Sequence, residues 1–110
     1  MLQQEIWYAD LNPVKRSEQK GYRPVVIISG NMLNAYLKVV IACPLTTKIK
    51  NYKGNVVLEP TELNGLSRQS EIMIFHVRSI SKDRLVRKIG SITEEELTGL
   101  KQGLDDILRY

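Results

Sequence analysis

Two positions in this sequence carry residue types that could bind an anion. Arg23 ends a polar segment, and Thr46 and Thr47 end an apolar one. A guanidinium is permanently charged and can hold two phosphate oxygens at once, and a threonine hydroxyl can donate a further hydrogen bond. If the adjoining apolar segments form neighbouring strands, these side chains form a plausible anion site. Taken singly, Arg23 is more simply a surface ion pair, and the two threonines are more simply the polar end of a strand.

Two further side chains could move protons. Glu18 lies in the polar segment before Arg23, where an ionised carboxylate could accept a proton, hold the arginine in place or simply be solvated. His76 is the only histidine, and histidine is the residue type that titrates nearest to neutral pH. A lone histidine near a strand end is also commonly a hydrogen-bonded structural residue. The residues alone leave both roles open.

Positive charge gathers on both sides of these side chains. The basic residues of the two flanking segments are Lys15, Arg16 and Lys20, then Lys48, Lys50 and Lys53. The whole chain has 16 Lys and Arg against 12 Asp and Glu, a formal net charge of +4. This balance favours a polyanion or an acidic partner, although solvated loop charge is an equally simple interpretation of the clusters.

Length and composition exclude several classes of protein. With 110 residues, we expect one domain over residues 1–110. The sequence contains no run of about 20 apolar residues and starts with no secretory signal, which predicts a cytoplasmic protein without a membrane segment. One Cys and one His cannot form an internal disulfide or a zinc cluster. We therefore expect neither a metal nor another cofactor.

Short apolar runs separated by turn residues predict a mainly β (α+β) fold. The expected strands are 5–10, 24–29, 37–45, 55–59, 72–75 and 77–80. The two continuous runs, 24–29 and 37–45, indicate strands buried on both faces. A helix is expected from Thr93 to Arg109, because a capping box precedes an apolar stripe formed by Leu97, Leu100, Leu104, Ile107 and Leu108. The sequence thus predicts a small β-barrel or half-barrel closed by a C-terminal helix.

Three segments carry an ordered motif that spans most of the chain. They are Ile6-Trp7 with Asp10, Asn12-Pro13, Ser17-Glu18-Gln19, Gly21 and Arg23-Pro24; then Pro44-Leu45-Thr46-Thr47; then Val77-Arg78-Ser79-Ile80. In these segments the chain resembles the MazF/PemK/Kid family of toxin endoribonucleases. The resemblance implies an SH3-like barrel that forms a homodimer and needs no metal.

The resemblance also implies a reaction and partners. Members of this family cleave single-stranded RNA, including mRNA, at short motifs by attack of the 2′-hydroxyl, leaving 2′,3′-cyclic phosphate and 5′-hydroxyl ends and so inhibiting translation. An antitoxin with an acidic, flexible tail normally neutralises the toxin, which suits the positive charge of this chain. Toxin and antitoxin together are expected to bind DNA as repressors of their own operon.

By the same resemblance, the catalytic residues are Arg23, Thr46 and Glu18. We expect Arg23 to stabilise the charged phosphorane rather than to move protons, because a guanidinium is a poor base. The residues implied to bind RNA are Ser17, Gln19, Lys20, Thr47, Lys48, His76 and Arg78.

Phe75 and His76 depart from the family pattern, which commonly has an acidic residue followed by glutamine. We expect this pair to alter base recognition by stacking and hydrogen bonding, while His76 could also act as general acid or base.

Two other functions remain open on the sequence. The same barrel could bind RNA without cutting it, if the changes at Phe75 and His76 abolish activity. It could also be a toxin that acts on DNA gyrase, since related barrels do so. Those relatives depend on a tryptophan in an apolar C-terminal end, whereas the only tryptophan here is Trp7. Cleavage of RNA is therefore the preferred hypothesis.

Overall fold

The computed structural model describes residues 1–110 except the side chain of Gln19. Its strands are β1 (Glu5–Asp10), β2 (Tyr22–Ile27), β3 (Val39–Thr46), β4 (Val56–Leu58), β5 (Ser70–Ile72), β6 (Arg78–Ser81) and β7 (Leu85–Ser91). The α-helices are α1 (Asn31–Tyr36) and α2 (Glu94–Arg109), and short 3₁₀ turns are η1 (Gln19–Gly21), η2 (Ile74–His76) and η3 (Lys82–Arg84).

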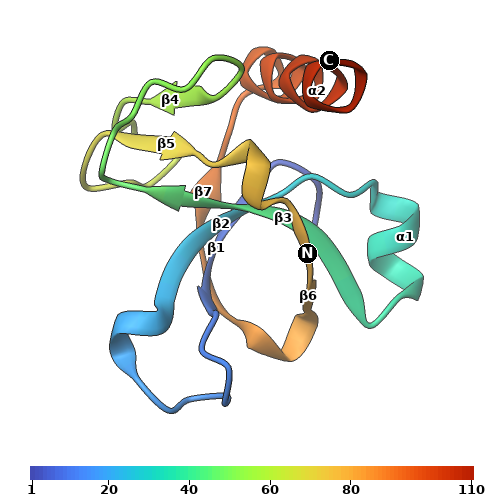
Figure 1. Cartoon of the computed structure of the whole chain (residues 1–110). Helices are drawn as coiled ribbons and strands as arrows, with labels where there is room; N and C mark the ends of the chain where they lie inside the picture. The colour runs from blue at the N-terminus through green and yellow to red at the C-terminus, as the bar shows by residue number, and fades with distance from the viewer.

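One curled, seven-stranded antiparallel sheet forms the body of the protein (Figure 1). The strand order is β4-β5-β3-β2-β1-β7, and β6 pairs with the other end of β3. The register between β1 and β7 shifts twice, between Ile6 and Trp7 and between Tyr8 and Ala9. Such irregularities increase the local bend of a sheet. The predicted small half-barrel with a C-terminal helix is confirmed.

The curl gives the sheet two buried faces. The outer core lies between the sheet and α2 and includes Val26, Cys43 and Leu100. The inner core lies within the curl and includes Val25 and Ala42. Consecutive residues of a strand point to opposite faces, so the neighbours Val25 and Val26 enter different cores. The prediction of burial on both faces is confirmed for residues 25–27 and for residues 42–45. It is wrong for the first half of the run 37–45, where Leu37, Val39 and Ile41 are exposed.

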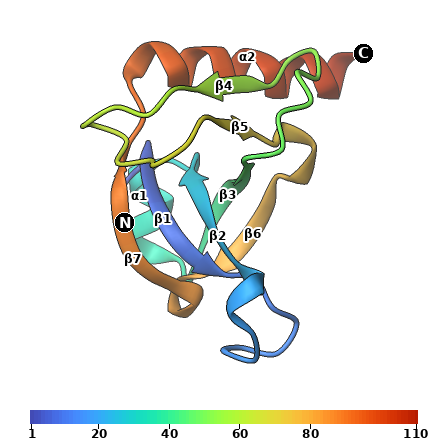
Figure 2. The same cartoon turned by 90° about the vertical axis from the view of Figure 1, so that its left-hand side faces the viewer.

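Helix α2 begins where the capping box predicts. The Thr93 hydroxyl accepts a hydrogen bond from the Glu96 amide at 3.0 Å, and the Glu96 carboxylate accepts one from the Thr93 amide at 2.8 Å. Leu97 and Leu100 are buried in the outer core, and the helix lies along β4 (Figure 2). Among the described residues, none of the helices combines the length and apolarity needed to cross a membrane.

The prediction of a strand over 72–75 is wrong beyond Ile72. Strand β5 ends there, and the chain makes the 3₁₀ turn η2 over Ile74–His76. The reason is that β5 and β6 pair with different parts of β3, Thr46 with Glu71 but Val40 with Ile80. The turn between these two pairings leaves Phe75 and His76 exposed.

Candidate active site

The register of β2 and β3 brings the two principal candidate residues together. Val25 pairs with Pro44 and Val26 with Cys43, and continuing this register by two residues places Arg23 opposite Thr46. Cross-strand partners project from the same face of a sheet. Since Val25 belongs to the inner core, Arg23 and Thr46 project at the open end of that core.

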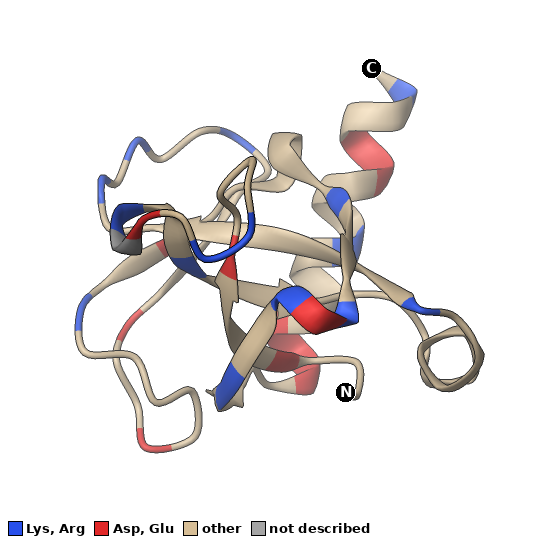
Figure 3. Cartoon of the chain, turned by 90° about the horizontal axis from the view of Figure 1, so that it is seen from below, with Lys and Arg blue, Asp and Glu red and all other residues tan. Residues whose placement is uncertain are grey.

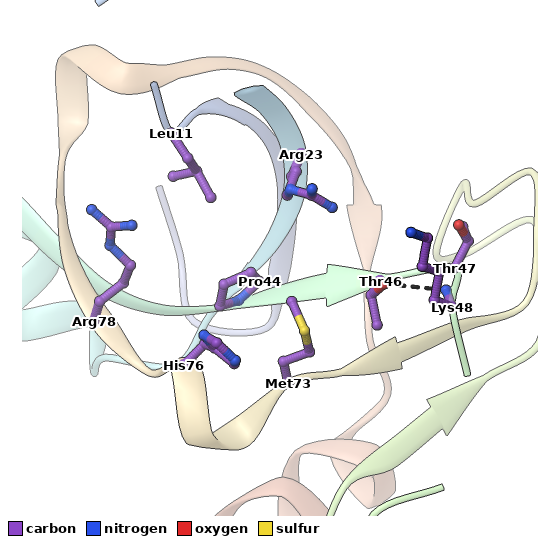
Figure 4. A pocket seen from close by; sticks show the side chains of 9 residues that line it. All are labelled: Leu11, Arg23, Pro44, Thr46, Thr47, Lys48, Met73, His76 and Arg78. Carbon is purple, nitrogen blue, oxygen red and sulfur yellow. Dashed lines mark hydrogen bonds between the residues drawn. The ribbon is translucent and has the colours of Figure 1, made fainter. Parts of the chain in front are cut away.

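A pocket of about 470 Å³ opens at this point, and we call it the Arg23 pocket. The residues that line it are Leu11, Arg23, Pro44, Thr46, Thr47, Lys48, Met73, His76 and Arg78 (Figure 4). Arg23 enters from β2, Thr46 from the end of β3, His76 from η2 and Arg78 from β6.

Electrostatics make the Arg23 pocket suitable for an anion. Arg23, Lys48 and Arg78 contribute three positive charges, and none of the described residues that line the pocket is acidic. Further Lys and Arg positions lie on strands and loops at the open end of the sheet, with acidic positions interspersed (Figure 3). Like charges on one wall repel one another unless an anion neutralises them, so the pocket fits a phosphate chain.

Thr46 can still donate a hydrogen bond into the pocket. Its hydroxyl oxygen accepts the Lys48 amide at 3.1 Å. Because a hydroxyl is an acceptor and a donor at once, its proton remains able to reach a phosphate oxygen.

The loop between β1 and β2 projects beyond the sheet on the side away from α2 (Figure 2), and Asp10 anchors it. The buried Asp10 carboxylate accepts the Asn12 amide at 3.1 Å, the Asn12 side chain at 2.7 Å and the Arg16 amide. Arg84 lies 4.0 Å from it. Burial raises the pKa of Asp10, but the hydrogen bonds from Arg16 and Asn12 and the charge of Arg84 outweigh this, and the net shift is downward. The loop therefore rests on an ionised carboxylate.

Gly21 completes this anchor. The Asn12 side chain donates to the Glu18 carbonyl at 2.5 Å, and a Cβ atom on residue 21 would lie only 1.9 Å from Asn12 Oδ1. Only glycine leaves room for that amide. Asp10, Asn12 and Gly21 of the sequence motif thus shape the loop that leads to Arg23.

The structure brings together some of the predicted site residues and leaves others apart. Arg23, Thr46, Thr47, Lys48, His76 and Arg78 all line the Arg23 pocket. Glu18, Ser17 and Lys20 are exposed on the loop, where Glu18 pairs with Lys20 at 3.3 Å. The side chain of Gln19 lies outside the described part of the chain. The roles expected for these loop residues stay predictions.

Sequence reasoning missed several residues of the site. Leu11, Pro44 and Met73 line the pocket, but apolar side chains give no sequence signal for such a role. Glu71 is buried beside Thr46 on the neighbouring strand. The one available signal was an acidic residue directly before the apolar run that starts at Ile72. Within the described residues, no group of three or more His, Cys, Asp or Glu is arranged to hold a metal ion.

Comparisons with known proteins identify a family for the chain. Residues 2–108 match the family described as PemK-like, MazF-like toxin of type II toxin-antitoxin system. The chain is 32% identical over 103 residues to Endoribonuclease MazF of Staphylococcus saprophyticus, covering 92% of this chain and 85% of that protein. It is 35% identical over 106 residues to Endoribonuclease MazF9 of Mycobacterium tuberculosis, covering 91% and 89%.

A solved structure shares the fold. It is described as an endoribonuclease in complex with its cognate antitoxin from Mycobacterial species, and it superposes with a TM-score of 0.81 at 21% identity over 98% of this chain and 94% of that one. The match to the family over nearly the whole sequence, together with these relatives, places this chain in the PemK-like, MazF-like family of type II toxins.

Proposed function

We propose that this chain is a toxin that cleaves single-stranded RNA, mRNA included, with residues 1–110 acting as one domain in the cytoplasm. The observation that carries the proposal is that Arg23 and Thr46 together line a cationic pocket of about 470 Å³. The two relatives described above are named endoribonucleases, which supports the choice of RNA as the polyanion.

The proposed reaction is a transesterification within the RNA strand. The 2′-oxygen of one nucleotide forms a bond to the adjacent phosphorus, and the bond from phosphorus to the 5′-oxygen of the next nucleotide breaks. The products are a 2′,3′-cyclic phosphate and a 5′-hydroxyl. Arg23 binds the non-bridging oxygens as negative charge develops on them, and the Thr46 hydroxyl donates a further hydrogen bond. These groups supply the required charge without a metal or cofactor.

The proton of the 2′-hydroxyl must leave, and one must reach the departing 5′-oxygen. His76 lines the Arg23 pocket and is of a type suited to both transfers. Glu18 does not line the Arg23 pocket and instead pairs with Lys20 at 3.3 Å. The geometry therefore favours His76 over Glu18 for proton transfer.

Base recognition in this proposal falls to exposed residues beside the pocket. Phe75 is 64% exposed at the turn before His76, where its ring can stack on an unpaired base. Lys48, Thr47 and Arg78 then contact the RNA on either side of the cut. Ser17, Gln19 and Lys20 extend this contact from the loop between β1 and β2.

Two protein partners belong to the proposal. An antitoxin with an acidic, flexible tail would compete with RNA for the cationic pocket, since both are anionic chains. A second copy of this chain would cover an apolar patch formed by exposed residues of α1, its C-cap and the adjoining half of β3, namely Met32, Leu33, Tyr36, Leu37, Val39 and Ile41. Several large apolar side chains exposed on neighbouring elements commonly mark a protein interface.

The proposal is tested by incubating the purified protein with a long single-stranded RNA, and with DNA of the same sequence, in excess chelator. The expected result is cleavage of RNA alone at a recurrent short motif, with cyclic phosphate ends. Binding of RNA without cleavage would instead indicate an RNA-binding module. A separate supercoiling assay with DNA gyrase covers the remaining alternative. Inhibition of gyrase by a protein that cuts no RNA would indicate a toxin that acts on gyrase.

A further inference from the structure

Glu71 makes four hydrogen bonds to one surface loop, although its side chain is buried and only 1% of the residue is exposed. Its Oε1 atom accepts the Lys50 amide at 2.6 Å and the Asn51 amide at 3.1 Å. Its Oε2 atom accepts the Tyr52 amide at 3.1 Å and the Asn55 side chain at 2.8 Å. The carboxylate thus gathers three consecutive backbone amides and one side chain of the segment that joins β3 to β4.

The position of Glu71 in the sheet connects this loop to the Arg23 pocket. On β5, Glu71 is the cross-strand partner of Thr46 on one side and of Val57 on the other. Residue 46 is where β3 ends and the loop begins. The loop therefore leaves the sheet beside Glu71 and is bound back onto the same residue four to six positions later.

The space next to Glu71 shares three lining residues with the Arg23 pocket. A small cavity of about 60 Å³ is lined by Glu71, Asn55, Tyr52 and Lys50 together with Thr46, Met73, Phe75 and His76. Thr46, Met73 and His76 line the Arg23 pocket as well. The loop residues Lys50 and Tyr52, whose amides Glu71 binds, thus line the same small cavity as three residues of the Arg23 pocket.

We propose that Glu71 is a positioning residue that fixes the loop after β3 and thereby holds Thr46, Thr47 and Lys48 in their places at the Arg23 pocket. This inference rests on the proposed endoribonuclease function, for which it names a residue that acts through its neighbours. Glu71 itself does not line the Arg23 pocket.

The carboxylate must be ionised to do this. Each of its oxygens faces two N–H donors, so an added proton would point at a donor. Burial raises the pKa of Glu71, but the hydrogen bonds from Asn55 and from the amides of Lys50, Asn51 and Tyr52 outweigh it and lower the pKa overall. A glutamine of the same shape would replace one oxygen with an NH₂ group facing two other donors.

The substitution Glu71→Gln therefore tests the inference, with Glu5→Gln as its matched control. Glu5 is also a buried carboxylate, with hydrogen bonds from the Leu2 amide and the Trp7 ring at 2.9 Å and an ion pair with Lys88 at 3.2 Å. Glu5 is the first residue of β1, whereas Ala9, which pairs with Arg23, lies near the other end of that strand. Both changes remove a buried charge, but only Glu71 contacts the loop.

The first readout needs no RNA. In Glu71→Gln, hydrogen exchange at the amides of Lys50, Asn51 and Tyr52 should accelerate at least about tenfold, while exchange in β1 and β2 stays near the wild-type rate. In Glu5→Gln those three amides should keep the wild-type exchange rate. Unchanged exchange at residues 50–52 in Glu71→Gln would overturn the inference whatever the activity.

The second readout is cleavage under conditions where each variant is folded. Glu71→Gln should lower kcat by about 10²-fold, since displacement of a positioning group by about 1 Å can cost that much. Its KM should change by less than about threefold, because the RNA-binding charges remain. Glu5→Gln should cleave at the wild-type rate. Equal kcat values for the two variants would show that Glu71 is only structural.

Two further outcomes keep the test decisive. If Glu71→Gln does not fold, Asn55→Ala serves in its place, because it removes one donor to Glu71 and the acceptor of the Ile74 amide at 3.2 Å. It should show the same exchange and kcat changes in smaller measure, and unchanged values would overturn the inference. If the wild-type protein cuts no RNA, the proposed function and this inference fall together, whereas a failure of the inference alone leaves wild-type cleavage intact.

Discussion

Arg23 and Arg78 reach the same pocket from two strands that flank β3 on opposite sides. Arg78 on β6 pairs with Ala42. Val25 on β2 pairs with Pro44, and extending that register by two residues places Arg23 opposite Thr46. The two arginines are thus offset by four residues of β3, about 13 Å along the strand at a rise of about 3.3 Å per residue. This spacing suits contacts with different phosphates of one RNA chain.

That offset predicts different kinetic effects for the two arginines. Arg78→Ala should raise KM for a long RNA and weaken the salt dependence of binding, because in the proposed function Arg78 binds a phosphate away from the cut. Its kcat should fall by less than about fivefold. The measurement is steady-state cleavage at several salt concentrations. A large loss of kcat with unchanged KM would place Arg78 at the scissile phosphate instead.

Thr46 offers a test of the hydroxyl itself. Thr46→Val keeps the shape but removes the donor to phosphate, and single-turnover cleavage should slow by about 10²-fold. Thr46→Ser keeps the hydroxyl and its bond from the Lys48 amide, and it should retain most of the activity. If the valine variant cut as fast as the serine variant, the hydroxyl would have no part in the reaction.

Two glycines of α2 should respond in opposite ways to the same substitution. A Cβ atom at Gly99 would meet Val56 at 3.7 Å, an ordinary contact, whereas one at Gly103 would lie 2.3 Å from the Gly54 carbonyl oxygen. Gly99→Ala should therefore raise the free energy of unfolding by up to about 1 kcal/mol through helix propensity. Gly103→Ala should lower it by about 1–3 kcal/mol through overpacking. Urea unfolding measures both changes in the free energy of unfolding. If both substitutions changed it in the same direction, the close packing of α2 on Gly54 would be contradicted.

The apolar patch of α1 and β3 predicts the oligomeric state. Met32 and Tyr36 are 76% and 83% exposed, so glutamates there should leave the fold intact while burying charge in a dimer interface. Light scattering should find a dimer for the wild type and a monomer for the double variant Met32→Glu/Tyr36→Glu. Leu108→Glu, at an 85% exposed position of α2, is the control and should remain a dimer. If the double variant had the same mass in solution as the wild-type dimer, this surface would not be the dimer interface.

The sequence predicts most of the fold because strong local signals mark it. Three central elements are predicted from such signals: β2 and β3 from their apolar runs, and α2 from the capping box at Thr93. Helix α1 was missed because its N-cap, Gly30, makes no side-chain hydrogen bond and it has only six residues. Strand β7 was missed because charged and half-buried residues interrupt its apolar pattern.

The site is less accessible to sequence reasoning than the fold. The motif identifies Arg23 and Thr46, but their opposition depends on the register of β2 and β3, which no local pattern encodes. Glu18 precedes Arg23 closely in sequence, yet it pairs with Lys20 and does not line the Arg23 pocket. Glu71 binds mainly backbone amides, and such partners leave no trace in residue types.

The most direct test of the central claim is single-turnover cleavage of an end-labelled single-stranded RNA in excess chelator by wild type, Arg23→Ala and Arg23→Lys. Arg68→Ala is the control, since Arg68 is exposed and does not line the Arg23 pocket. Arg23→Ala should cut about 10²–10³-fold more slowly, Arg23→Lys should recover part of the loss, and the control should match the wild type. Cleavage by Arg23→Ala at the wild-type rate, at the same sites and with the same cyclic phosphate ends, would contradict the account.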